Sequence, residues 1–255
     1  MDFNILAPVF VVVVIGGMGS LPGAYVAAVL ISVLNVFGVN YLPQSTLALM
    51  FVVMVVVLIF RPFGLFGREE VAGEHGQVGE PERPIKPAGQ TARLIVMAGL
   101  ALLAIVPLVG DSFVQVLITD IAIFCLFAAS LHFLLGLGGL VSFGHAAYFG
   151  GGAYAAALLV TYAGTPMELA LILAPLAAGL TAIIFGWVCL RLTGVYFAML
   201  TLAFAQLLWS LVFQWGDFTG GDDGLVDIWP SEWASGTTTF YYLAMVLCIG
   251  GIIVL

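Results

Sequence analysis

One ionisable side chain, His145, lies inside a segment that otherwise consists of small and apolar residues. The segment 136–159 reads GLGGLVSFGHAAYFGGGAYAAALL. Ionisable residues inside a membrane are functional hypotheses by default, so this imidazole could contact a transported solute. The alternative is a neutral imidazole that bonds to a backbone carbonyl or to Ser142, three residues earlier on the same helix face. No second metal-ligating side chain stands at ligand spacing, so we expect no metal site.

Small residues dominate the positions that follow this histidine. Gly150, Gly151 and Gly152 form overlapping small-xxx-small pairs with neighbouring alanines, and Tyr148 lies in the same stretch. Such pairs let helix backbones approach closely in lipid, which we take as their main role. A share in lining a solute pathway is the alternative, with carbonyls of a distorted helix as polar contacts.

A second candidate group lies in the apolar run YFAMLTLAFAQLLW, residues 196–209. Thr201 and Gln206 are its strongly polar side chains, and Tyr196 stands at its start. Buried polar groups need partners, so each bonds either to a neighbouring helix or to a passing solute. We favour hydrogen bonds between helices, which are common in membrane bundles.

The remaining residues offer no catalytic constellation. The glycine-rich stretches GLGGLVSFG and GGMGSLPG lack the strand and the Gly-Lys-Ser/Thr that phosphate-binding loops require. Cys125, Cys189 and Cys248 stand singly in apolar runs, where cysteines usually behave as small hydrophobes. Asp120 is a lone carboxylate in the outer half of an expected span. We therefore expect no catalytic residue and no cofactor, and any ATP hydrolysis would belong to other subunits.

The composition indicates which elements hold these residues. Hydrophobic residues make up 63% of the chain and charged residues 8%, with a mean hydropathy of +1.20. Soluble domains carry roughly a quarter charged residues, so this composition excludes a soluble globular domain. The sequence predicts an all-α polytopic membrane protein with about eight or nine hydrophobic helical segments, some of them broken or re-entrant.

The distribution of positive charge predicts the orientation. Five of the six basic residues lie in the interval 61–93, and the sixth is Arg191. Basic residues near span ends stay cytoplasmic, which places 61–93 in the cytoplasm and the loop 214–239 outside. A span needs about 20 apolar residues. The expected spans are Tyr41–Phe60, Leu94–Val109, Phe113–Leu135, Val141–Ala163, Glu168–Leu190, Val195–Phe213 and an incomplete Phe240–Leu255.

Two regions leave alternatives open. Residues 5–38 form two short apolar runs around GGMGSLPG, which could be two spans or one broken, re-entrant element. The outer motif TGGDDG has turn-forming residues throughout. It is either a solvated turn or a docking site for a binding protein, formed by Thr219, Gly220, Gly221, Asp222, Asp223 and Gly224.

These motifs resemble the permease subunits of branched-chain amino-acid ABC importers. RLTGVYFAMLTLAFAQ (191–206) and TGGDDGL (219–225) follow the 136–159 segment in the order that this family has them. Residues 1–67, with IGGMGSLPGAYVAAVLISVL and FRPFGLFG, are similar to the C-terminal part of a first permease. Residues 94–255 are similar to the N-terminal part of a second permease. The polar stretch 68–93, where we expect disorder, would then be a cytoplasmic linker.

The resemblance implies a function and a set of partners. The chain would form part of a translocation pathway in a bacterial inner membrane, with ABC ATPase subunits, a periplasmic substrate-binding protein and another permease subunit as partners, and no nucleic acid. It favours the structural role for His145, because substrates of this family are not proton-coupled. Relatives that carry urea or short amides are an alternative, as is a stand-alone channel or secondary carrier.

The ends of the sequence depart from the family pattern. The family's short basic helices that dock into the ATPase would lie beyond both ends of these 255 residues. We therefore also consider a fragment that lacks the coupling loops and has no transport function of its own.

Overall fold

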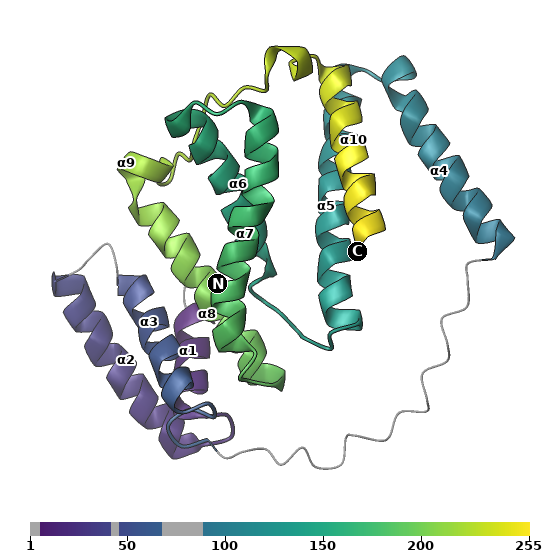
Figure 1. Cartoon of the computed structure of the whole chain (residues 1–255). Coiled ribbons are helices and arrows are strands. Elements are labelled where there is room, and N and C mark those ends of the chain that lie inside the picture. The colour runs from purple at the N-terminus through teal and green to yellow at the C-terminus, as the bar shows by residue number, and fades with distance from the viewer. Residues whose placement is uncertain (1–5, 42–45, 68–88) are drawn as a thin grey trace. The chain divides into compact units, whose positions relative to one another are not determined.

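The computed structural model describes residues 6–41, 46–67 and 89–255, and the regular elements in this part of the chain are helices (Figure 1). Within it, nine apolar helices of 11 to 25 residues confirm the predicted all-α fold. They are α1 (Leu6–Gly16), α2 (Leu21–Tyr41), α3 (Thr46–Phe60), α4 (Gln90–Val109), α5 (Ser112–Gly136), α6 (His145–Ala163), α7 (Met167–Cys189), α8 (Gly194–Gln214) and α10 (Thr237–Val254). Two short elements, α9 (Gly216–Thr219) and the 3₁₀ turn Glu232–Ala234, lie between α8 and α10.

Five of the described helices are long and apolar enough to cross a membrane: α2, α5, α7, α8 and α10. They have 18 to 25 residues, which at about 1.5 Å per residue is roughly 27–38 Å. The hydrocarbon core of a bilayer is about 30 Å thick. The chain is therefore a multi-pass membrane protein.

The packing divides the chain into two compact units. One consists of Met1–Glu69 and Leu131–Trp229, and the other of Glu70–Ser130 and Pro230–Leu255. The first unit holds α1–α3 and α6–α9, whereas the second holds α4, most of α5 and α10. The two units are defined by contacts between residues and do not test the origin of the sequence segments. That residues 1–67 and 94–255 correspond to parts of two permeases therefore stays a prediction.

The N-terminal region consists of two helices with a tight turn between them. The Ser20 hydroxyl accepts a hydrogen bond from the backbone N–H of Gly23 (3.1 Å), as an N-cap residue does, and α2 begins directly after it. The helix then continues past Gly38 to Tyr41. The expected span start at Tyr41 is thus wrong, because Tyr41 belongs to α2 and α3 begins at Thr46, against which the buried Gly38 packs.

The core of the first unit lies where α1–α3 pack against α8. The segment after α3 folds back on α1, and the N–H groups of Leu65 and Phe66 donate to the carbonyls of Ile15 (2.8 Å) and Gly16 (3.1 Å). These bonds satisfy carbonyls at the end of α1 that have no helical partner. Tyr196 of α8 contacts the Phe63 ring edge-on, with 5.6 Å between centroids, and donates to the Phe63 carbonyl (3.4 Å). The described residues 6–41 and 46–67 are therefore an integral part of this unit.

In the second unit a tyrosine compensates for a proline in the neighbouring helix. Pro107 lies inside α4 and cannot donate to the carbonyl of Leu103, four residues earlier. The hydroxyl of Tyr241, which is 1% exposed, donates to that carbonyl at 2.8 Å. The adjacent Tyr242 hydroxyl donates to the Ala104 carbonyl at 3.0 Å. The carbonyl that the proline leaves unpaired thus links α4 to α10.

Removal of this hydroxyl should be costly only while the proline is present. We expect Tyr241→Phe to lower the free energy of unfolding by about 1 kcal/mol, the usual net contribution of one hydrogen bond. In a Pro107→Ala background the restored N–H can pair with Leu103, so the same change should cost less. Thermal unfolding of the four proteins in detergent measures the coupling. Equal losses in both backgrounds would contradict the compensation.

Candidate functional site

The candidate site is built on α6, which begins at His145 and not at Val141 as expected. Residues 137–144 are non-helical, and glycines at 136, 138, 139 and 144 disfavour a helix here. Ser142, which is buried, therefore precedes the helix and does not share a helical face with His145. This corrects the geometry that the sequence suggested for these two residues.

Thr201 holds this non-helical segment against α8. Its hydroxyl accepts a hydrogen bond from the N–H of Phe143 (3.1 Å) and donates to the carbonyl of Ala198 (2.7 Å). A Cβ atom at Gly144 would lie 2.3 Å from the Thr201 carbonyl oxygen, so only glycine fits there. Thr201 is 3% exposed. Its hydrogen-bonding capacity is thus used within the protein, which is one of the two roles that the sequence left open.

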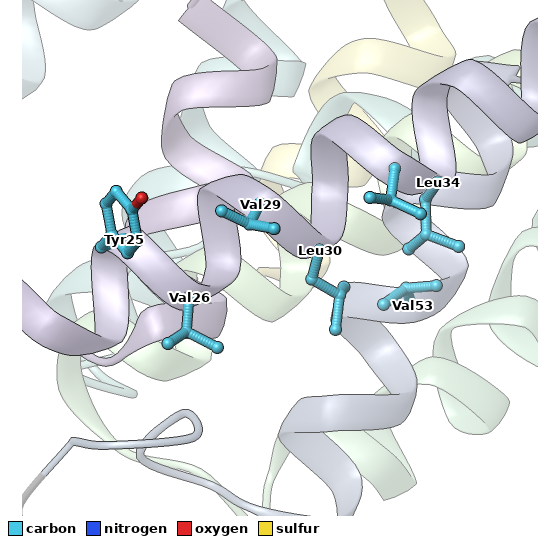
Figure 2. Close-up of a pocket in the computed structure, with 7 residues that line it drawn as sticks. Tyr25, Val26, Val29, Leu30, Leu34 and Val53 are labelled. Atoms are coloured by element: carbon cyan, nitrogen blue, oxygen red, sulfur yellow. The ribbon is translucent and has the colours of Figure 1, made fainter.

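Two other candidates, His145 and Tyr148, line neither of two pockets in the described part of the chain, one between α6 and α8 and an apolar one of about 590 Å³ on α2 and α3 (Figure 2). His145 is half-buried at the first position of α6. Tyr148 packs on Phe185 of α7, with 6.4 Å between ring centroids, and Phe185 stacks in turn on Phe204 of α8 at 4.4 Å. Tyr148 thereby contributes to the packing of α6 on α7.

The three consecutive glycines of α6 have different surroundings. A Cβ atom at Gly152 would lie 3.5 Å from the Cβ of Ala178, so this glycine faces α7. A Cβ atom at Gly150 or Gly151 would have no atom of another element within 4 Å. Close packing explains the small residue at Gly152, whereas Gly150 and Gly151 border open space.

That space is a pocket of about 350 Å³ between α6 and α8. It lies within the range of roughly 300–1,000 Å³ that is typical of small-molecule sites. Most of its walls are apolar, and Gln206, Tyr154 and Trp209 are the lining residues whose side chains contain a polar group. It is lined by Phe143, Ala146, Ala147, Gly150, Gly151, Tyr154, Leu202, Ala205, Gln206, Leu208, Trp209, Val212, Phe213 and Gly221.

Of the predicted site residues, the pocket brings together Gly150, Gly151, Gln206 and Gly221. It also contains residues that sequence reasoning missed. On α8, Trp209 and Phe213 follow Gln206 at helical spacing and stack at 5.0 Å. Tyr154 lies one turn after Gly150. The spacing of three or four residues could have indicated that these side chains share a helix face. It does not indicate which face of the helix is left uncovered by its neighbours.

Side-chain hydrogen bonds fix the start of the loop after α8 to α6 and α8. Thr219 is 3% exposed, and its hydroxyl donates to the carbonyls of Trp215 (2.9 Å) and Val212. The hydroxyl of Tyr162, on α6, donates to the carbonyls of Asp217 (3.2 Å) and Phe218 (3.0 Å). The Thr219 side chain is thus buried within the loop, so docking by this motif stays a prediction that would involve its exposed residues.

The rest of the motif forms the expected turn. The N–H of Asp223 donates to the carbonyl of Gly220 (3.2 Å), and Gly220, Gly221 and Gly224 have left-handed backbone angles. Asp222 and Asp223 are exposed. The motif thus presents two carboxylates on the loop that closes one end of the pocket.

A multi-pass helical membrane protein with a largely apolar, solute-sized pocket between two helices can bind a small and mostly apolar molecule. The sequence profile described as "Branched-chain amino acid transport system / permease component" matches residues 113–255, and the chain belongs to this family. All of the pocket-lining residues fall within the matched region.

Individual relatives carry the same family description in their names. The high-affinity branched-chain amino acid transport system permease protein LivM of Escherichia coli is 33% identical over 106 residues, which are 42% of this chain and 25% of LivM. LivM of Salmonella typhimurium gives the same figures. The corresponding permease protein BraD of Pseudomonas aeruginosa is 40% identical over 63 residues, which are 24% of this chain and 20% of BraD. The chain thus spans about a quarter of the length of these curated relatives or less. No solved structure matches.

Proposed function

We propose that this chain supplies helices to the translocation pathway of an ATP-binding-cassette importer for branched-chain or related apolar amino acids. The pocket between α6 and α8 is the observation that carries the proposal. Its walls combine small residues of α6 with aliphatic and aromatic residues of α8, which suits an apolar side chain. The Gln206 amide could hydrogen-bond the polar part of the solute.

The position of the pocket supports entry from the loop side. Gly221, in the loop that carries Asp222 and Asp223, lines the pocket together with Phe213 near the end of α8. In the proposed topology this loop is periplasmic and residues 61–93 are cytoplasmic, in a bacterial inner membrane. A substrate-binding protein that docks on the two exposed carboxylates would therefore release solute next to the pocket.

Energy would come from separate subunits. ABC ATPases would bind on the cytoplasmic side and alternate the access of the pathway, and a further permease subunit would complete its wall. In this proposal, selectivity would depend mainly on the binding protein.

Uptake in proteoliposomes tests the proposal. The full chain, reconstituted with the ATPase, permease and binding-protein subunits of its own host, should accumulate radiolabelled leucine only when ATP and the binding protein are both present. Urea, supplied in a parallel reaction, should not accumulate. Leucine flux without ATP would indicate a channel or secondary carrier, and accumulation of urea alone would reassign the substrate.

A further inference from the structure

The inference concerns the end of the pocket that lies away from the loop after α8. On α8 the lining residues run from Leu202 to Phe213, about 17 Å along the helix axis. Gly221, in the loop, lines the pocket beyond Phe213. Phe143 lines the opposite end, because its N–H bonds to Thr201, directly before Leu202. The pocket therefore runs from the loop to Phe143.

In the proposed topology the Phe143 end of the pocket faces the cytoplasm. Tyr196, the third residue of α8, contacts Phe63 through its ring and its hydroxyl. Phe63 belongs to the interval 61–93 that the basic residues place in the cytoplasm, so α8 begins on that side. Thr201 is the eighth residue of α8, about 10 Å from the helix start. A solute that enters from the loop side therefore meets Phe143 before it reaches the cytoplasmic end of the helix.

A hydrogen bond and a backbone contact hold the segment around Phe143 on α8. The Phe143 N–H donates to the Thr201 hydroxyl (3.1 Å), and this hydroxyl donates in turn to the Ala198 carbonyl (2.7 Å). The backbone of Gly144 lies so close to the Thr201 carbonyl that only glycine fits there. The position of Phe143 at the end of the pocket thus depends on Thr201.

The residues before Phe143 allow this segment to move. Residues 137–144 are non-helical and include Gly138 and Gly139. Gly139 has a φ of 61°, and an added Cβ atom there would have no atom of another element within 4 Å. Glycine has the widest backbone freedom of all residues. Once the bond to Thr201 breaks, rotation at these glycines can withdraw Phe143 from the pocket.

We propose that residues 140–144 are the inner gate of the pathway. Phe143 closes the pocket toward the cytoplasm, and the Thr201 hydroxyl is the latch that holds Phe143 in place. This inference rests on the proposed function and deepens it, because it assigns the structure to the state that accepts solute from the periplasmic side. Rearrangement driven by the ATPases would release the Phe143 N–H from Thr201 and let the solute pass.

Thiol labelling in right-side-out and inside-out membrane vesicles, without ATP, tests the gate. The reporter is Ala147→Cys, which lines the pocket one helical turn after Phe143, in a chain whose Cys125 and Cys248 are replaced by alanine. A membrane-impermeant maleimide should label the reporter from the periplasmic side but not from the cytoplasmic side. Thr201→Val keeps the shape of the side chain but leaves the Phe143 N–H without its acceptor. It should raise the labelling rate from the cytoplasmic side about tenfold.

Three controls accompany this measurement. Thr201→Ser retains the hydroxyl and should keep the cytoplasmic labelling rate low. Thr181→Val removes a hydroxyl of α7 that donates to the Ala178 carbonyl (2.8 Å), and it should leave the labelling unchanged. The native Cys189, which is 1% exposed, stays in place and should remain unlabelled as long as the unit is folded.

Cytoplasmic labelling of Ala147→Cys while Thr201 is unaltered, or equal rates for Thr201→Val and Thr201→Ser, would overturn the proposal. Labelling of Cys189 in Thr201→Val would also overturn it, because the bond would then stabilise the whole unit and not a gate. The same holds if the reporter is labelled from neither side, because the pocket would then open to neither compartment. The labelling requires no particular solute. The expected pattern together with a failure of leucine uptake would therefore support the gate and contradict the proposed substrate.

Discussion

Gly150→Phe is expected to abolish solute transport while the helix packing stays intact. A Cβ atom at Gly150 would have no atom of another element within 4 Å, so the aromatic ring can enter the pocket of about 350 Å³ without displacing α8. The ring would fill the space that we assign to the side chain of the solute. Uptake of leucine in the reconstituted system should fall by about tenfold or more, as expected when a preformed small-molecule site is occupied.

Gly179→Phe is the matched control for this substitution. Gly179 lies in the middle of α7, is exposed, and likewise has no neighbour within 4 Å of an added Cβ atom. The same ring added there points away from the pocket, so transport should be retained. Normal uptake by Gly150→Phe, or equal losses in both variants, would show that the pocket does not lie on the pathway. Melting temperatures of both variants, measured in detergent, exclude misfolding as the cause.

The membrane helices were predictable because the bilayer leaves few alternatives. Every backbone polar group of a spanning segment must be paired internally, so an apolar run of sufficient length must be helical. The expected spans Glu168–Leu190 and Val195–Phe213 differ from α7 and α8 by one residue at each end. For such segments composition alone determines the element.

The boundaries set by tertiary contacts were not predictable. The sequence contains equally apolar residues before and after His145, but residues 140–144 lie non-helical against Thr201. Likewise α2 continues beyond Gly38, a residue type that disfavours helices, and this glycine is buried against Thr46 in the next helix. The first boundary depends on Thr201, which is distant in sequence. The second depends on how α2 and α3 are connected, and the composition of the sequence does not specify this geometry.

The sequence predicted only some of the residues that line the pocket, and it did not predict their roles. Gly150 and Gly152 are identical in type and differ by about 200° in direction around α6. Only the position of α7 distinguishes the glycine that packs from the one that borders the pocket. From the sequence, Thr201 and Gln206 likewise had the same two possible roles. They differ because the short hydroxyl of Thr201 reaches Phe143 and Ala198, whereas the Gln206 amide lines the pocket.

Gly23→Ala is expected to destabilise the protein strongly, because α1 and α2 touch through their backbones. A Cβ atom at Gly23 would lie 2.1 Å from the carbonyl oxygen of Gly16, so one helix must move. Overpacking of this kind costs about 1–3 kcal/mol or more. Gly179→Ala, in open space on α7, should instead stabilise by up to about 1 kcal/mol, since alanine is the better helix former. Thermal unfolding in detergent should therefore shift in opposite directions for the two variants.

The reciprocal contact gives this prediction a second, independent measurement. A Cβ atom at Gly16 would lie 2.6 Å from backbone atoms of Gly23 and Ala24, so Gly16→Ala forces the same separation of α1 from α2. Once one methyl group has moved the helices apart, the second meets less resistance. The double variant should therefore lose less stability than the sum of the single losses, as residues in contact do. Strictly additive losses would mean that the two glycines act on separate contacts, and an unchanged melting temperature for Gly23→Ala would mean that the helices are not in backbone contact.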